Sequence, residues 1–376
     1  MRPARVSEPL YRVCSYFIPR LMFLNASQAA QIHWGDLVLA LQGFPEDCLD
    51  LGSAEFWRCW MERWATLGHD YRRKASQSSS AAGRKTLLRS AAACFHWAEF
   101  MYFSDPVRKR ELRHEAKRCF HASLELGGPR MRLGELVYGD VVMPYYLVFP
   151  EERDPRGGAA PCVILSNGLD SMTEVEIFAF AELFLARGMA TFLFDGPGQG
   201  INLGQSPIAI QFEGVVERVI GFLEGQADVD AGSLGFFGVS FGGYLALRIA
   251  RAIGSRFKGV INLSGGPRLA PFSSLPRRLK EDFQFAFLGG DAPGMQDVFR
   301  RLELDPSGAL RTDVLSVHGA LDDIFPLAEL EALDRAWEDR HELRIYDTEA
   351  HVCLNYIGQY SVEIADWMSA RLTARE

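Results

Sequence analysis

Hydrophobic positions follow two different periods along the chain, and the change falls near residue 130. Before that point apolar residues recur at helical spacing, as in the tryptophan-rich face of segment 54–64. Segments 86–103 and 108–126 show the same spacing, so we expect further helices there. The serine-rich stretch 75–83 predicts a loop between the helix that contains 54–64 and the helix at 86–103.

Beyond residue 130 short apolar strands alternate with helical segments. The strands expected are 135–140, 145–149, 161–166, 189–195, 233–239, 257–264, 313–318 and 342–347. The helices expected are 174–187, one within 207–225, 240–253, 327–339 and 359–372. This alternation predicts the α/β class, with a mostly parallel, doubly wound sheet. The stretch from about 266 to 312 shows no strand pattern, and we expect a partly helical insertion there.

Composition narrows the function classes. The 376 residues carry a net charge of -8, which argues against a nucleic-acid partner because phosphates attract a basic surface. The seven cysteines form no CxxC pair, so neither a disulfide framework nor a zinc site is expected. No apolar stretch approaches 18 residues, so no membrane span is expected, and we expect a cytoplasmic protein with reduced thiols. Nothing in the sequence calls for a metal or a cofactor.

One motif carries clear chemistry. The sequence Gly-Val-Ser-Phe-Gly at 238–242 matches the pattern G-x-S-x-G and stands between an expected strand and an expected helix. A sharp turn at that place needs small flanking residues, which Gly238 and Gly242 supply. The turn would expose the hydroxyl of Ser240 at the end of the sheet, so Ser240 is the predicted nucleophile.

A serine nucleophile needs a base and an acid, which follow it in the chain for this kind of turn. Asp322 lies three residues after Gly319, behind an expected strand, and is the predicted acid; Asp323 is the alternative. His351 follows the last expected strand and is the predicted base. His318 precedes the acid and is expected to be structural.

The negative charge that develops on the substrate oxygen needs two backbone N–H donors. Phe241, next to the nucleophile, should supply one of them. Leu169, in the loop after strand 161–166, should supply the other, and Gly168 lets that loop approach closely. The glycine-rich segment 195–200 lacks the features of a phosphate-binding loop and is expected to be a structural turn near the pocket.

With these segments together, the chain resembles the α/β-hydrolase superfamily, and within it the fermentation-respiration switch esterase-like branch. That branch includes 2,6-dihydroxypseudooxynicotine hydrolase and the fungal yellowish-green-type polyketide hydrolyases. The resemblance rests on segment 91–98, the Asn-Gly-Leu-Asp-Ser loop at 167–171, segment 195–200, the Ser240 turn and the acid and base segments. It covers most of residues 85–372.

The resemblance implies an α/β-hydrolase fold with a helical cap over 1–130 and a catalytic domain over 131–376. It implies a bulky aromatic or polyketide-like ketone or ester as the small-molecule substrate, cleaved at a C–C or an ester bond. Trp97, Phe100 and Gly168 are then expected to contact it, and a homodimer is expected.

Two other classes of function are compatible with part of this pattern. The same three residues could serve a non-hydrolytic biosynthetic reaction, such as acyl transfer, cyclisation or elimination. A binding protein on a hydrolase scaffold is the third class, although the intact set of serine, aspartate and histidine argues against it.

Overall fold

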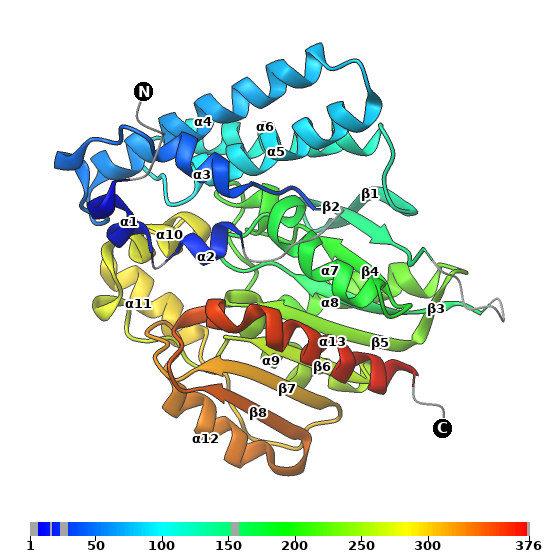
Figure 1. Cartoon of the computed structure of the whole chain (residues 1–376). Helices are drawn as coiled ribbons and strands as arrows, with labels where there is room; N and C mark the ends of the chain where they lie inside the picture. The colour runs from blue at the N-terminus through cyan, green and yellow to red at the C-terminus, as the bar shows by residue number, and fades with distance from the viewer. Residues whose placement is uncertain (1–6, 16, 23–28, 152–157, 374–376) are drawn as a thin grey trace. The chain divides into compact units, whose positions relative to one another are not determined.

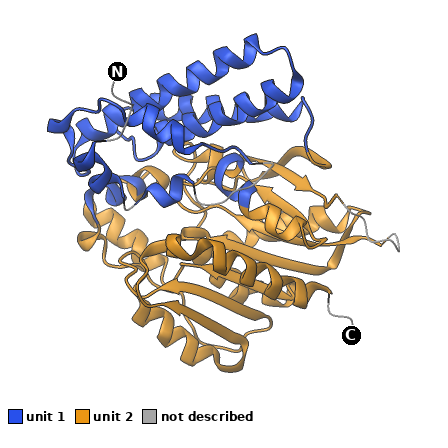
Figure 2. Ribbon diagram, in the orientation of Figure 1, with its two compact units in different colours: residues 1–128, 174–179, 276–282 blue, residues 129–173, 180–275, 283–376 orange. Residues whose placement is uncertain are grey.

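The computed structural model describes residues 7–15, 17–22, 29–151 and 158–373, which fall into two units (Figure 2). The helical unit comprises residues 1–128, 174–179 and 276–282. The sheet unit comprises residues 129–173, 180–275 and 283–376. Each unit is described by itself below.

The helical unit is built around three long helices that pack side by side (Figure 1). Its helices up to residue 128 are α1 (Glu8–Cys14), α2 (Ile18–Leu21), α3 (Trp34–Leu41), α4 (Ala54–Gln77), α5 (Ala81–Glu99) and α6 (Pro106–Leu124). Aromatic side chains fill the space between α4 and α5, where Trp60, Trp64 and Trp97 are fully buried. Trp60 and Trp64 belong to the face of α4 that the helical spacing of segment 54–64 predicted, whereas Trp97 comes from α5.

The expected loop over 75–83 is wrong for most of its length. Helix α4 continues to Gln77 and α5 begins at Ala81, so only residues 78–80 lie outside a helix. Ser80 caps α5, its Oγ accepting the N–H of Gly83 at 3.0 Å. Alanine is a strong helix former and serine a preferred cap, so a run rich in both residues is compatible with two helix ends.

The described residues of the sheet unit form one eight-stranded sheet. Its strands are β1 (Met131–Tyr138), β2 (Val141–Val148), β3 (Ala160–Ser166), β4 (Ala190–Phe194), β5 (Val229–Val239), β6 (Gly259–Leu263), β7 (Asp313–Gly319) and β8 (His341–Tyr346). The spatial order is β1-β2-β4-β3-β5-β6-β7-β8. β2 pairs antiparallel with both β1 and β4, and every pairing from β4 to β8 is parallel. The expected mostly parallel, doubly wound α/β sheet is confirmed.

Helices cover both faces of this sheet. They are α7 (Phe178–Leu185), α8 (Phe212–Glu224), α9 (Phe241–Ile253), α12 (Leu327–Trp337) and α13 (Ile357–Thr373). On β5, Phe237 contacts Phe180 and Phe184 of α7, and a Cβ at Gly235 would meet Met368 of α13. Because residues two apart in a strand share a face, α7 and α13 cover the same side. Phe222 of α8 contacts Phe192 of β4, which lies in register with Phe236 on the other face of β5, so α8 and the adjoining α9 pack on the opposite side.

Two further helices, α10 (Arg277–Ala286) and α11 (Ala292–Arg301), lie in the stretch 266–312. Phe299 packs there against Phe272 and Phe283, with ring centroids 5.4 and 4.9 Å from its own. Among the described residues, no helix combines the length and the apolar character needed to cross a lipid bilayer.

Candidate active site

The turn between β5 and α9 holds Ser240 in an unusual backbone conformation. Its φ of 57° and ψ of -120° lie outside the common regions for a residue with a side chain. The flanking glycines permit this turn, since a Cβ at Gly238 would lie 1.9 Å from the carbonyl oxygen of Gly242. The N–H of Ser240 donates to Leu263 O at 2.7 Å, which ties the turn to β6.

A continuous chain of hydrogen bonds runs from this serine to a carboxylate. Ser240 Oγ lies 2.7 Å from His351 Nε2, and His351 Nδ1 lies 2.7 Å from Asp322 Oδ2. With the serine O–H donating to Nε2 and the Nδ1–H donating to the carboxylate, both contacts are satisfied by one neutral tautomer. The structure thus brings the three predicted residues together from the ends of β5, β7 and β8.

The surroundings of Asp322 keep it charged. Its second oxygen, Oδ1, accepts the backbone N–H groups of Ile324 and Phe325 at 2.9 and 3.0 Å. Burial alone would raise the pKa of Asp322, but the charge and hydrogen bond of His351 outweigh burial, and the pKa is lowered. Asp323, the alternative acid, is exposed.

His318 lies behind the acid and is fully buried. Its Nε2 donates to the carbonyl oxygen of Phe325 at 2.9 Å and lies 3.7 Å from Asp322 Oδ2. Burial lowers the pKa of His318, which favours the neutral ring. The bond to Phe325 fixes the loop that also wraps Asp322.

The loop after β3 lies directly against the Ser240 turn. A Cβ at Gly168 would be 3.4 Å from Ser240 Cβ, and one at Gly242 would be 2.5 Å from the carbonyl oxygen of Asn167. Leu169, the expected second donor, is the next residue of this loop and is buried. Phe241 is the first residue of α9, where backbone N–H groups have no partner within the helix.

Supports for this loop were missed by sequence reasoning. Gln199 Nε2 donates to Asn167 O at 2.6 Å, and Asn167 Nδ2 donates to Thr173 Oγ1 at 2.7 Å. Thr173 Oγ1 in turn donates to Asp195 Oδ1 at 2.5 Å. Segment 195–200, expected only to be a structural turn, therefore holds the backbone next to Ser240. No local sequence pattern predicts a hydrogen bond such as that from Gln199 to Asn167, which joins residues 32 apart in the chain.

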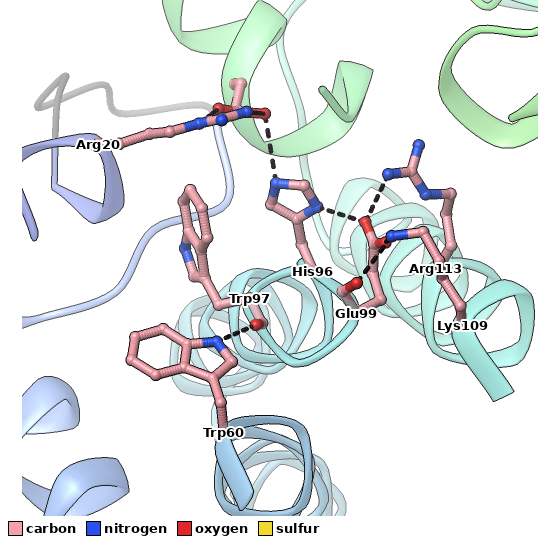
Figure 3. Close-up of polar contacts among 8 residues, drawn as sticks. Arg20, Trp60, His96, Trp97, Glu99, Lys109 and Arg113 are labelled. Atoms are coloured by element: carbon pink, nitrogen blue, oxygen red, sulfur yellow. Dashed lines mark hydrogen bonds and ion pairs between the residues drawn. The ribbon is translucent and has the colours of Figure 1, made fainter. Parts of the chain in front are cut away.

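Trp97 and Phe100, the expected substrate contacts, belong to the helical unit. Trp97 is 1% exposed and Phe100 5%, and their rings pack edge to face at 5.5 Å. The carbonyl oxygen of Trp97 accepts Trp60 Nε1 at 2.7 Å (Figure 3). Both side chains are thus part of the aromatic core of that unit.

A second group of buried polar residues, the His96 network, was also missed. His96 Nδ1 lies 3.0 Å from Glu99 Oε1, and His96 Nε2 lies 3.3 Å from Glu176 Oε2 (Figure 3). Lys109 and Arg113 of α6 pair with Glu99, while Arg20 pairs with Glu176 at 2.8 Å. Burial alone would lower the pKa of His96, but the two carboxylates raise it.

One cluster offers atoms that a metal ion could use. Ligand atoms of Cys48, Glu55 and Cys59 lie within 4.8 Å of one another in the helical unit. Arg58 already pairs with Glu55, and its Nη2 lies 3.8 Å from Cys59 Sγ. A cation would have to displace that guanidinium, and we assign no ion to this cluster.

Comparison with known proteins places these observations in context. The profile of FrsA-like esterases matches residues 52–274, and that of the prolyl oligopeptidase family matches residues 212–374. The chain is 28% identical over 358 residues to 2,6-dihydropseudooxynicotine hydrolase of Paenarthrobacter nicotinovorans. The aligned residues cover 91% of this chain and 92% of that protein. It is also 31% identical over 220 residues to 20-hydroxy-prefusarin hydrolase FUS2 of Gibberella moniliformis, and these residues cover 54% of this chain and 52% of that protein.

Solved structures agree with these relatives. The crystal structure of 2,6-dihydroxy-pseudo-oxynicotine hydrolase superposes with a TM-score of 0.78 at 25% identity, over 91% of this chain and 93% of the other. The structure of AbyA5 superposes with a TM-score of 0.68 at 19% identity, over 85% and 94%. The likeness to AbyA5 concerns the fold alone.

Proposed function

Because the chain belongs to the FrsA-like esterase family, we propose that it is a serine hydrolase with Ser240 as nucleophile, His351 as base and Asp322 as acid. It is an enzyme of the α/β-hydrolase type. The observation that carries the assignment of residues is the hydrogen-bonded chain from Ser240 Oγ to Asp322 Oδ2, with both contacts at 2.7 Å.

In the proposed reaction, Ser240 Oγ attacks the substrate carbonyl carbon while His351 Nε2 takes the hydroxyl proton. Asp322 holds the imidazole ring in the required tautomer and stabilises the imidazolium that forms. The carbonyl oxygen, now negatively charged, receives the N–H groups of Phe241 and Leu169.

Collapse of this intermediate breaks the bond to the leaving group and gives an acyl-Ser240. An ester releases an alkoxide, and a ketone with an acidic α-carbon releases a carbanion; either accepts the proton from the His351 imidazolium. Water then attacks the acyl group, His351 removes its proton, and the proton returns to Ser240 Oγ. Hydrolysis thus adds one molecule of water to the products.

We propose a bulky aromatic or polyketide-like ketone or ester as the substrate. Support comes from the names of the relatives, an oxynicotine hydrolase and a prefusarin hydrolase. Within the proposal, residues 1–130 form the cap domain and residues 131–376 the catalytic domain, with a cap-like insertion at about 266–312. Trp97, Phe100 and Gly168 are the proposed substrate contacts.

We further propose a cytoplasmic homodimer, for which cell fractionation and sedimentation velocity are the tests.

A fluorophosphonate probe tests the nucleophile without knowledge of the substrate. We expect covalent labelling of the wild-type protein and none of Ser240→Ala, because the probe reacts only with an activated serine. Ser274→Ala, which removes an exposed serine, is the matched control and should be labelled at the wild-type rate. A folded wild-type protein that stays unlabelled would refute the assignment of Ser240.

Candidate substrates then separate hydrolysis from the non-hydrolytic alternative. The mass of the products decides, since hydrolysis adds water whereas cyclisation gives an isomer and acyl transfer a conjugate.

A further inference from the structure

The backbone that follows His351 is strained. Val352 has a φ of 70° and Cys353 a φ of 48°, two consecutive residues with side chains in the left-handed region. A positive φ is especially unfavourable for valine, whose branched Cβ crowds the backbone. Such a conformation persists only where the surrounding structure enforces it, and it is often found at functional sites.

Two side chains hold both polar backbone groups of Val352. The N–H of Val352 donates to Ser264 Oγ at 3.0 Å, and Tyr360 OH donates to the carbonyl oxygen of Val352 at 3.0 Å. Ser264 and Tyr360 are both fully buried. Tyr360 comes from α13, and Ser264 follows directly on β6.

Ser264 also lies at the point where the three segments of the proposed triad meet. The preceding residue, Leu263, accepts the N–H of Ser240 at 2.7 Å. The N–H of Ser264 donates to Val317 O, at the end of β7 before the acid, at 2.8 Å. Ser264 itself has a φ of 53°, which turns the chain sharply where β6 ends. The end of β6 is therefore bonded to the nucleophile segment, the acid segment and the base segment.

We propose that Ser264 and Tyr360 are positioning residues that clamp the backbone of Val352 and so hold His351 Nε2 in line with Ser240 Oγ. This inference rests on the proposed triad. Neither residue takes part in the chemistry; each acts through His351. A displacement of the imidazole of about 1 Å would be enough to lower the rate of proton transfer by roughly a hundredfold.

The rate of fluorophosphonate labelling tests the clamp. Ser264→Ala and Tyr360→Phe each remove one hydroxyl, and we expect each to lower the maximal labelling rate by roughly 10- to 100-fold. The probe concentration at half-maximal rate should change little, because neither side chain is placed at the proposed substrate contacts. Tyr356→Phe makes the same change just before α13 begins and should label at the wild-type rate.

A second substitution separates positioning from general loss of structure. Glycine adopts a positive φ without strain, so Val352→Gly added to Ser264→Ala should recover part of the lost rate. A rate loss that Val352→Gly does not relieve would overturn the clamp, as would wild-type labelling in both single variants. Thermal unfolding identifies any variant that fails to fold, and Tyr360→Phe then carries the test because it keeps the buried ring. Failure of the wild-type protein to label would instead overturn the proposed triad.

Discussion

At the scale of the residue, the adjacent carboxylates Asp322 and Asp323 differ in both burial and hydrogen bonding. Asp322 is 6% exposed and bonded to His351, while Asp323 is exposed to solvent. The spacing from Gly319 favoured Asp322 as the acid, but it left Asp323 open as the alternative. The choice depends on the direction in which the loop after β7 turns, and that direction is set by backbone N–H groups folding onto Asp322.

This difference gives a prediction at the same scale. Asp322→Asn should lower kcat by roughly a thousandfold or more, because the amide cannot hold the imidazole tautomer or balance the imidazolium charge. Asp323→Asn should leave kcat within about twofold, as expected of an exposed carboxylate. Steady-state hydrolysis of an activated ester by the two variants provides the measurement. A larger loss in Asp323→Asn would reassign the acid.

At the scale of the element, the Ser240 turn is the part of the site that sequence predicts best. The pattern G-x-S-x-G between a strand and a helix is local, so its residues report directly on the geometry they must adopt. The supports of the neighbouring loop are different, since Gln199 reaches Asn167 across 32 residues. The loop predicted for the serine-rich stretch 75–83 was also wrong for most of its length, because serine occurs both in loops and as a helix cap and the local pattern does not distinguish the two.

Substitution of the turn glycines tests this element. Gly238→Ala should destabilise the protein by roughly 1–3 kcal/mol or more, because the new Cβ would lie 1.9 Å from the carbonyl oxygen of Gly242. Labelling at Ser240 should fall with it. Gly221→Ala is the control, since a Cβ there meets nothing within 4 Å in α8, and alanine should stabilise that helix by up to about 1 kcal/mol. Urea unfolding measures both changes, and equal effects would contradict the steric argument.

At the scale of the whole molecule, the His96 network joins parts of the chain that are distant in sequence. Arg20 and Glu176 are 156 residues apart, and His96 links Glu176 to α5 and, through Glu99, to α6. No periodic pattern in the sequence signals these pairs, because each residue alone resembles an ordinary helix-surface charge. Their burial becomes visible only when the helices pack.

The charge state of His96 determines how the network responds to pH. Its pKa is raised in the folded protein, so the folded state binds a proton more tightly than the unfolded chain. The resulting stabilisation is complete below the unfolded pKa of about 6.5 and is lost as pH rises through the folded pKa. Other buried histidines act in the opposite direction: burial lowers the pKa of His341 to about 4, which reduces stability as pH falls below about 6.5.

The contribution of His96 can be isolated by comparing the wild-type protein with His96→Gln. The difference between their free energies of unfolding, measured in urea from pH 6 to 9, should be largest near pH 6 and should shrink as pH rises, because only the wild-type protein carries the buried imidazolium between Glu99 and Glu176. His69→Gln is the control: the pKa of His69 is lowered by burial, so its difference curve should be flat from pH 7 to 9. A flat curve for His96→Gln over the whole range would show that His96 binds no extra proton in the folded protein, and that Arg20, Lys109 and Arg113 alone balance the two carboxylates.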